Sequence, residues 1–292
     1  MLSTSRLLSS LFCAVSLAAG LCAQPPQIEF PAPSPLCSLR QRVGLTDIEI
    51  SYSRPGVKDR LVFGGIVPYG QVWRTGANAS TKISFSTPVK LNGVSIPAGR
   101  YALYTIPGEK EWTIIIYKDT TLWGALKYDP KDDLARFKAA PAQMPDLLET
   151  FTTEFNDIRD ESATLNLAWE KTRVPIRIEV DLETTLLPQI DAAMASPEKK
   201  SAGFYYQAAT YYFTHGRDLR KTLSWVNTAL AEQPRTNLDY QLLYLKARIL
   251  ARVGDRGGAI AAARESTEAA VKIEGASSSF VRMNADLITS LQ

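Results

Sequence analysis

The sequence is almost free of histidine, because His215 is the only one in 292 residues. A Ser-His-Asp or Cys-His catalytic arrangement needs an imidazole base, and most zinc sites are built from several His or Cys ligands. The long segment before His215 therefore cannot form such a triad, nor the His-rich metal site of a cupin-type barrel. His215 itself precedes Gly216, which ends a predicted helix, so we expect it to be a capping or surface residue.

Cysteine is nearly as scarce, with three residues, Cys13, Cys22 and Cys37. The first two fall in a predicted export signal, so the processed chain would keep Cys37 alone. An intramolecular disulfide is then excluded, even in an oxidising compartment. We expect Cys37 to be a buried or unpaired thiol, and the stability of the protein to come from its hydrophobic cores.

The chain also lacks a strong net charge and long apolar segments. Its net charge is only +3, so the composition gives no electrostatic case for binding nucleic acid. After the N-terminal region, no stretch is long and apolar enough to supply the roughly 20 residues of a transmembrane helix. We therefore expect neither a nucleic-acid partner nor a transmembrane segment.

Residues 1–23 have the pattern of a secretory signal peptide. Arg6 gives a positive start, an apolar run follows over 7–21, and small residues precede a predicted cleavage after Ala23. A transmembrane anchor is one alternative, but the run is too short for a span. A lipid attached to Cys22 is another, although Leu21 precedes it where a small residue is usual. The signal predicts a periplasmic or extracellular protein.

The remaining sequence divides into a Pro-rich linker over 24–35, a β domain over 36–182 and an α-helical domain over 183–292. In the β domain, short segments such as 46–52 alternate between apolar and polar residues, and turns rich in Gly and Pro separate them. Asn92-Gly93 predicts a hairpin with a type I′ turn. Because no helical pattern lies between the strands, we predict an antiparallel β-sandwich or barrel-like fold.

Other segments of the β domain are less regular. Residues 112–117 are apolar on both faces, which predicts a strand in the centre of a sheet. The stretch 122–145 is irregular, and we expect a helical turn at 131–138 within it. Near the end of the domain, 163–169 and 174–180 each alternate and are predicted as strands.

From Leu182 the apolar period changes from two to 3.6, which indicates α-helices. Ser196-Pro197-Glu198 has the pattern of a helix start, and we expect Gly216 and Gly254 to end two helices. The helix pairs resemble tetratricopeptide repeats, although only about two units are present; a plain helical bundle is the alternative. We predict that this small tetratricopeptide-like domain contacts a protein partner.

Residues 52–81 contain the densest group of side chains suited to binding. Their Gly and Pro content excludes a helix or one continuous strand. Guanidinium groups suit carboxylate, phosphate or sulfate, and aromatic rings can stack on a sugar. We therefore predict a site for a small anionic or saccharide ligand, formed by Arg54, Arg60, Tyr69, Arg74, Asn78 and Thr81.

The alternative is that these side chains only stabilise the loop. Arg54 and Arg74 would then bind carbonyl and carboxylate groups of the loop, and Trp73 would fill the core. In an extended segment, adjacent side chains point to opposite faces. We therefore expect Trp73 to be buried and Arg74 to project outward, towards Arg54 and Asn78.

Five motifs are spread over the β domain: YSRPGVK at 52–58, FGGIVPYG at 63–70, VWRTGAN at 72–78, PAGRYALYTIPG at 97–108 and EWTII at 111–115. Together they resemble a bacterial family, domain of unknown function 2911 (DUF2911). The resemblance covers about 33–181. It implies an exported protein with a β-rich domain that helices often follow, and it implies no activity. One departure is Asp59, where the family typically has Gly, which leaves the local turn open.

These features favour an exported, non-catalytic binding module, and we predict no catalytic residue, cofactor or metal. A calcium site at Asp129, Asp132 and Asp133 would lack the spacing and the Gly of a Ca²⁺ loop. One alternative is a hydrolase of envelope glycans, which needs only two carboxylates, although no pair of acids stands out. Another alternative is a structural envelope protein.

Overall fold

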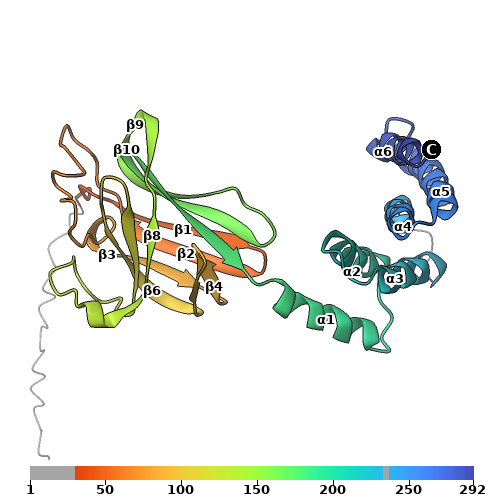
Figure 1. Cartoon of the computed structure of the whole chain (residues 1–292), viewed down its shortest axis with the longest axis horizontal. Helices are drawn as coiled ribbons and strands as arrows, with labels where there is room; N and C mark the ends of the chain where they lie inside the picture. Colours follow the sequence, from red (N-terminus) through yellow and green to blue (C-terminus); the bar gives the residue numbers. More distant parts are fainter. Residues whose placement is uncertain (1–29, 233–236) are drawn as a thin grey trace, which may run out of the picture. The chain divides into compact units, whose positions relative to one another are not determined.

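The computed structural model describes residues 30–232 and 237–292. The predicted signal peptide with its cleavage site, Cys22 and most of the linker lie outside these residues. The chain divides into two compact units, Met1–Val180 and Asp181–Gln292. Their described parts contain antiparallel sheets in the first unit and six helices in the second (Figure 1). The predicted β-plus-α fold class is thereby confirmed.

The first unit contains two antiparallel sheets within its described residues. The six-stranded sheet has the order β1-β2-β3-β6-β7-β8. Its strands are β1 (Leu36–Val43), β2 (Thr46–Ser53), β3 (Ala77–Phe85), β6 (Gly99–Ile106), β7 (Trp112–Tyr117) and β8 (Asp133–Ala139). The four-stranded sheet has the order β5-β4-β10-β9. Its strands are β4 (Val89–Leu91), β5 (Val94–Ile96), β9 (Ala142–Asn156) and β10 (Ser162–Val180).

One hydrophobic core is shared by both sheets. The six-stranded sheet contributes Ile50 of β2 and Ile114 of β7, and the four-stranded sheet contributes Leu167 and Ile178 of β10. Each of these side chains is at most 1% exposed. Because alternate residues of a strand share a face, each sheet turns one apolar face to this core. The two sheets therefore pack as the predicted β-sandwich.

The hairpin at Asn92-Gly93 is confirmed. Both turn residues have positive φ, 46° for Asn92 and 82° for Gly93, as a type I′ turn requires. Leu91 pairs with Val94 across the turn. Strand β7 lies between β6 and β8, which confirms its predicted place in the interior of a sheet.

Three details differ from the predictions. Residues 131–138 do not form a helical turn, because a short 3₁₀ helix, Pro130–Asp132, leads directly into β8. Strand β8 forms backbone hydrogen bonds with the second edge of β7. This pairing outweighs the local preference for a helix. Strand β1 was not predicted, and the two strands expected at 163–169 and 174–180 are one strand, β10.

A second, smaller apolar cluster lies on the other face of β6 and β7. Tyr104 of β6 and Tyr117 of β7 are buried there, although they point away from the shared core. Leu122, Ala125 and Tyr128 pack against them from the segment between β7 and β8. This segment therefore covers part of the six-stranded sheet.

The second unit consists of α1 (Glu183–Ala195), α2 (Ala202–Thr214), α3 (Leu219–Glu232), α4 (Asp239–Val253), α5 (Arg256–Glu274) and α6 (Ser279–Ser290) among its described residues. From α2 onward each helix packs against the next, an arrangement compatible with a repeat-like stack and with a plain bundle. In the described part of the chain, no helix is long and apolar enough to cross a membrane.

The helix ends agree with the predictions except at one point. Gly216 and Gly254 follow α2 and α4 with positive φ, 64° and 88°, and His215 is the C-cap residue of α2, as expected. The predicted start at Ser196-Pro197-Glu198 is wrong. Helix α2 begins later, because Ser201 is its N-cap and accepts a hydrogen bond from the Phe204 backbone amide.

Candidate ligand-binding site

The segment between β2 and β3 begins with two arginines that hold the backbone in place. Arg54 donates hydrogen bonds from Nε to the Phe151 carbonyl (3.1 Å) and from Nη2 to Thr152 Oγ1 (2.7 Å). Arg60 donates from Nε to the Val57 carbonyl (3.0 Å) and from Nη2 to the Gly56 carbonyl (2.7 Å). Arg54 thus joins the segment to β9, and Arg60 closes a local turn.

Asn78 and Thr81 lie in β3 and also have partners within the protein. Asn78 has φ 59°, and its Nδ2 donates to Ser53 Oγ at 3.2 Å. Thr81 is fully buried, and its hydroxyl donates to the Thr75 carbonyl. Tyr69 is 41% exposed, and the Cε2 and Cδ2 atoms of its ring lie next to Gly64. The structure does not bring these three side chains together.

Trp73 and Arg74 follow in an extended segment that pairs with β6. The Trp73 amide donates to the Thr105 carbonyl (2.7 Å), and the Thr105 amide donates to the Trp73 carbonyl (2.9 Å). The indole ring lies in the shared core, stacked on Trp169 with a centroid distance of 5.9 Å. The Trp73 ring therefore fills the core.

Arg74 lies on the opposite side of this segment. Its Nε atom is fully covered and has no hydrogen-bond partner among the described residues. Most buried polar atoms in proteins are hydrogen-bonded, and an unsatisfied one costs about 1–3 kcal/mol. The guanidinium extends to Gly124, where a Cβ atom would lie only 3.0 Å from Nη1. It thus points to the segment between β7 and β8, and not to Arg54 and Asn78 as expected.

Arg74 lines a hollow of about 590 Å³, which we call the Arg74 groove. One wall comes from the segment before β3 and the other from the segment between β7 and β8. The lining residues are Ile66, Val67, Pro68, Gln71, Val72, Trp73, Arg74, Ala125, Leu126 and Tyr128. Apolar side chains predominate, and Arg74 is the only charged residue among them. The groove therefore combines one cation with apolar walls.

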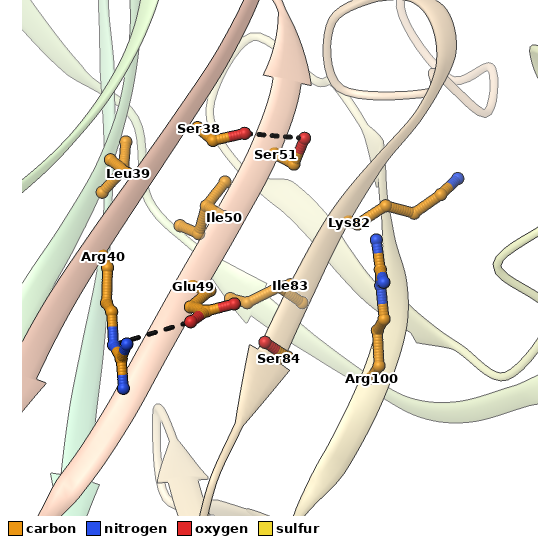
Figure 2. A pocket seen from close by; sticks show the side chains of 10 residues that line it. All are labelled: Ser38, Leu39, Arg40, Glu49, Ile50, Ser51, Lys82, Ile83, Ser84 and Arg100. Atoms are coloured by element: carbon orange, nitrogen blue, oxygen red, sulfur yellow. Dashed lines mark hydrogen bonds and ion pairs between the residues drawn. The ribbon is translucent and has the colours of Figure 1, made fainter.

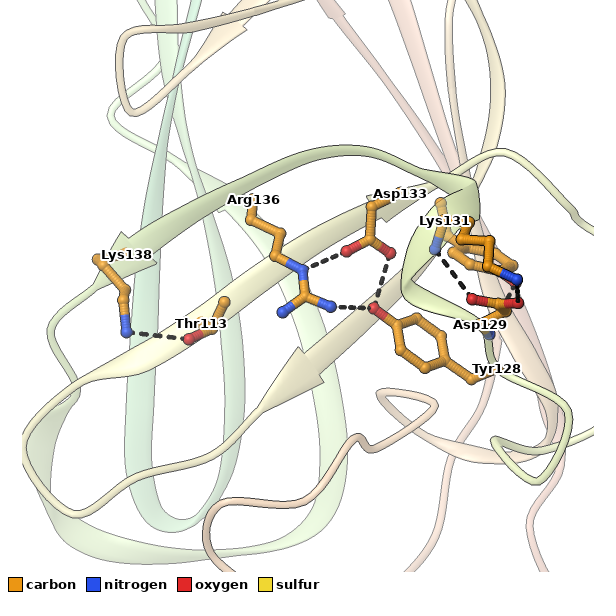
Figure 3. A network of polar contacts seen from close by, with 8 residues as sticks. Thr113, Tyr128, Asp129, Lys131, Asp133, Arg136 and Lys138 are labelled. Atoms are coloured by element: carbon orange, nitrogen blue, oxygen red, sulfur yellow. Dashed lines mark hydrogen bonds and ion pairs between the residues drawn. The ribbon is translucent and has the colours of Figure 1, made fainter.

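The side chain of Tyr128 is fixed by a polar network behind the groove (Figure 3). Its hydroxyl donates to Asp133 Oδ1 (2.7 Å) and accepts from Arg136 Nη2 (2.6 Å), and Arg136 also pairs with Asp133. Burial and the hydrogen bond to Asp133 raise the pKa of Tyr128. Tyr128 is therefore a neutral wall of defined orientation.

Two large apolar side chains at the groove extend into solvent. Leu126 is 101% exposed and Ile66 is 45% exposed. Exposed apolar groups beside a hollow are typical of ligand-binding surfaces. The exposed surface of these two side chains is available to an apolar ligand.

The groove contains one of the six predicted site residues, Arg74. The wall at 125–128 was missed, because it lies in a stretch without a regular apolar period. A signal was present nonetheless: Trp123 and Leu126 are large apolar residues in a short apolar run, 122–126, that polar residues flank on both sides. Such residues outside any helix or strand pattern are candidates for an exposed binding wall.

Neither the curated proteins nor the solved structures contain a significant match to the chain. A family model does match: the family described as protein of unknown function (DUF2911) covers residues 34–178. This range begins before β1, reaches into β10 and includes both walls of the Arg74 groove. Through its β-sheet unit, the chain therefore belongs to the DUF2911 family.

Proposed function

We propose that the β-sheet unit is a non-catalytic binding module, and that the Arg74 groove takes a small anionic ligand. The observation that carries this proposal is the half-buried guanidinium of Arg74, the one charged group that lines the groove, which has no acceptor among the described residues. Its Nε atom is covered by the protein, and an oxyanion in the groove would accept hydrogen bonds from its Nη atoms. Hydrogen bonds between charged groups are worth about 1.5–3 kcal/mol, more than most neutral ones.

The walls favour a ligand with an apolar body. Leu126 and Ile66 extend beside the arginine, and the volume of about 590 Å³ suits a small organic molecule. A carboxylate with an aliphatic or aromatic body meets both requirements. A saccharide is the second candidate, because Gln71 also lines the groove and its amide can bond to hydroxyl groups.

The wider setting of this module is also part of the proposal. The signal-peptide pattern supports export to the periplasm or the outside of the cell, and the helical unit would contact a protein partner. A glycan hydrolase would need its two carboxylates outside the Arg74 groove, whose lining contains none. A structural envelope protein would use the groove for no small ligand at all.

Titration calorimetry with paired probes tests the proposal. The probes are octanoate and 4-phenylbutyrate, each compared with the corresponding neutral alcohol, and chitotriose serves as a saccharide probe. The variants are Arg74→Ala and Arg74→Lys. Arg173→Ala is the matched control, because Arg173 is an exposed arginine of β10 that does not line the groove.

We expect saturable binding of a carboxylate and no binding of its alcohol. Arg74→Ala should weaken the binding at least tenfold, Arg74→Lys should weaken it less, and Arg173→Ala should leave it unchanged. Binding of chitotriose that depends on Arg74 would favour the saccharide. Carboxylate binding that is equal in the wild type and in Arg74→Ala would contradict the site, and turnover of chitotriose would favour the hydrolase.

A further inference from the structure

A second hollow lies on the outer face of the six-stranded sheet, away from the shared core. Its volume is about 500 Å³, and we call it the outer-face hollow. Strands β1, β2, β3 and β6 form its floor (Figure 2). None of its lining residues lines the Arg74 groove. The two hollows are therefore separate.

The strand register places two polar rows across this face. In one row Ser38 pairs with Ser51, which pairs with Lys82. In the next row Arg40 pairs with Glu49, Glu49 with Ser84, and Ser84 with Arg100. Directly paired residues of antiparallel strands share a face of the sheet. The floor is therefore rich in hydroxyl groups and in charged side chains.

The charges on this face are unequally matched. Arg40 contacts two carboxylates, Asp47 at 2.9 Å and Glu49 at 3.5 Å. The side chain of Arg100 is exposed and has no hydrogen bond or ion pair among the described residues. Lys82 donates to the Ser80 carbonyl at 2.9 Å and has no carboxylate within ion-pair distance in the described chain. Two cations therefore lack a paired anion.

These two cations lie close together. Because Arg100 pairs with Ser84 and Lys82 with Ala102, Lys82 and Arg100 are diagonal neighbours, a spacing of about 7–8 Å that long side chains can bridge. Figure 2 shows the Arg100 guanidinium extending towards Lys82. Burial lowers the pKa of Lys82, and the charge of Arg100 lowers it further.

Carboxylates near the hollow have other contacts. Glu49 faces it but pairs with Arg40. Asp119 acts on Lys82 from the segment after β7, but it accepts hydrogen bonds from the Thr121 amide (2.7 Å) and the Thr121 hydroxyl (2.6 Å). The repulsion between Lys82 and Arg100 is therefore only partly offset within the protein.

We propose that the outer-face hollow binds a phosphate or sulfate group, either free or attached to a sugar. Lys82 and Arg100, which lie on the same side of the hollow, would both contact the oxyanion, and Ser51 and Ser84 would donate hydrogen bonds from the floor. A multiply charged oxyanion suits two converging cations, and guanidinium binds it through two parallel hydrogen bonds. No aromatic ring lines the hollow, so the charged group and not the sugar ring is recognised.

Calorimetry and ³¹P NMR on the purified protein test this inference. The probes are inorganic phosphate, inorganic sulfate, glucose 6-phosphate and, as the uncharged comparison, glucose. The variants are Arg100→Ala and Lys82→Met. The control is Arg173→Ala, because Arg173 is exposed and lines neither hollow. Circular dichroism verifies that each variant is folded.

We expect saturable binding of phosphate, sulfate or glucose 6-phosphate and none of glucose. Arg100→Ala and Lys82→Met should each weaken it at least fivefold, and raised salt should weaken it further. The control variant should bind as the wild type does. Binding of glucose 6-phosphate alone would identify a sugar-linked group. No binding of any charged probe, or equal binding by wild type and Arg100→Ala, would overturn the proposal.

Discussion

Trp73 and Arg74 are adjacent in the chain and lie in different environments. The Trp73 ring stacks on Trp169 inside the shared core, while the Arg74 side chain reaches Gly124 on the outer side. Backbone pairing with Thr105 keeps this segment extended, and successive side chains of an extended segment alternate in direction. One short segment thus holds a core residue and a candidate binding residue.

The first prediction separates these two roles. Trp73→Ala should lower the free energy of unfolding by roughly 3–5 kcal/mol, as large aromatic truncations in cores do. Arg74→Ala should leave it unchanged or raise it, by at most about 1–3 kcal/mol, since it removes a covered, unsatisfied atom and no hydrogen bond. Urea unfolding followed by tryptophan fluorescence measures both. If Arg74→Ala proves as damaging as Trp73→Ala, Arg74 is structural, and the groove should be abandoned as a binding site.

The second prediction concerns the contact between Arg74 and Gly124. Gly124 and Gly70 have nearly equal φ, 74° and 73°, but a Cβ at Gly70 would meet nothing within 4 Å. Alanine at either position should cost about 1–3 kcal/mol of stability for the backbone conformation. Gly124→Ala should cost more than Gly70→Ala, because its methyl group displaces Arg74.

A double-mutant cycle provides the control. In the Arg74→Ala background, the extra cost of Gly124→Ala over Gly70→Ala should disappear. An extra cost that persists there would mean that another neighbour of Gly124 causes it.

The third prediction concerns the side chain of Lys82. Its pKa is lowered by burial and by the positive charge of Arg100. Arg100→Ala removes only the second cause, so the pKa of Lys82 should rise and yet stay below its ordinary value. Lysine ¹³Cε NMR titration measures the change. An unaltered pKa would show that the two cations are too far apart to share one oxyanion.

The fourth prediction concerns the helical unit. Asp191 of α1 accepts hydrogen bonds from Lys221 Nζ and from the Tyr212 hydroxyl, both at 2.5 Å. Both contacts lower the pKa of Asp191, and the hydrogen bond from Lys221 has the larger effect. The Asp191 carboxyl group therefore loses its proton at a lower pH in the folded protein than in the unfolded chain. The contacts of ionised Asp191 stabilise the folded state fully when the pH is above the ordinary carboxyl pKa. This stabilisation is lost as the pH falls through the lowered pKa of Asp191 in the folded protein.

Lys221→Met should raise the pKa of Asp191 towards its ordinary value, which ¹³C NMR of the carboxyl group can measure. Lys246→Met is a suitable control, because Lys246 lies in α4 and makes no contact with Asp191. Equal shifts in the two variants would point to a general charge effect and not to this contact.

The fifth prediction concerns processing. If residues 1–23 are a cleaved signal peptide, protein recovered from the periplasm or the medium should begin near Gln24. N-terminal sequencing decides this. A lipid on an N-terminal Cys22 would establish the anchored alternative, and recovery of an intact Met1 from the cytoplasm would contradict export.

The sequence predicted strands that have a clear local pattern, either two faces of different polarity or, at 112–117, two apolar faces. The hairpin at Asn92-Gly93 and the strand at 112–117 are local patterns that the pairing of neighbouring strands reinforces. Strand β1 was missed because most of its residues are exposed or only half-buried. Residues 131–138 were misassigned because their charged residues fit a helix equally well, and only β7 as a partner makes them a strand.

The candidate site was harder to predict than the fold. Arg54 lies in the segment that the sequence predicts to bind a ligand, but its hydrogen-bond acceptor is the carbonyl of Phe151, 97 residues away in the chain. No local sequence pattern predicts a contact over such a separation. Arg74 could be singled out only through the alternation with Trp73, and the wall that completes its groove comes from a separate segment without a regular pattern.

Strand β10 also determines when the β-sheet unit can be completed. Its last residues, Ile178 to Val180, pair with β4, a strand that is made much earlier, at Val89–Leu91. As the ribosome makes the chain, the β4–β5 hairpin must wait for residue 180 before it joins its sheet. Long-range pairing of this kind slows folding. If the chain is exported as proposed, export can begin before residue 180 has been made and thus before the sandwich closes.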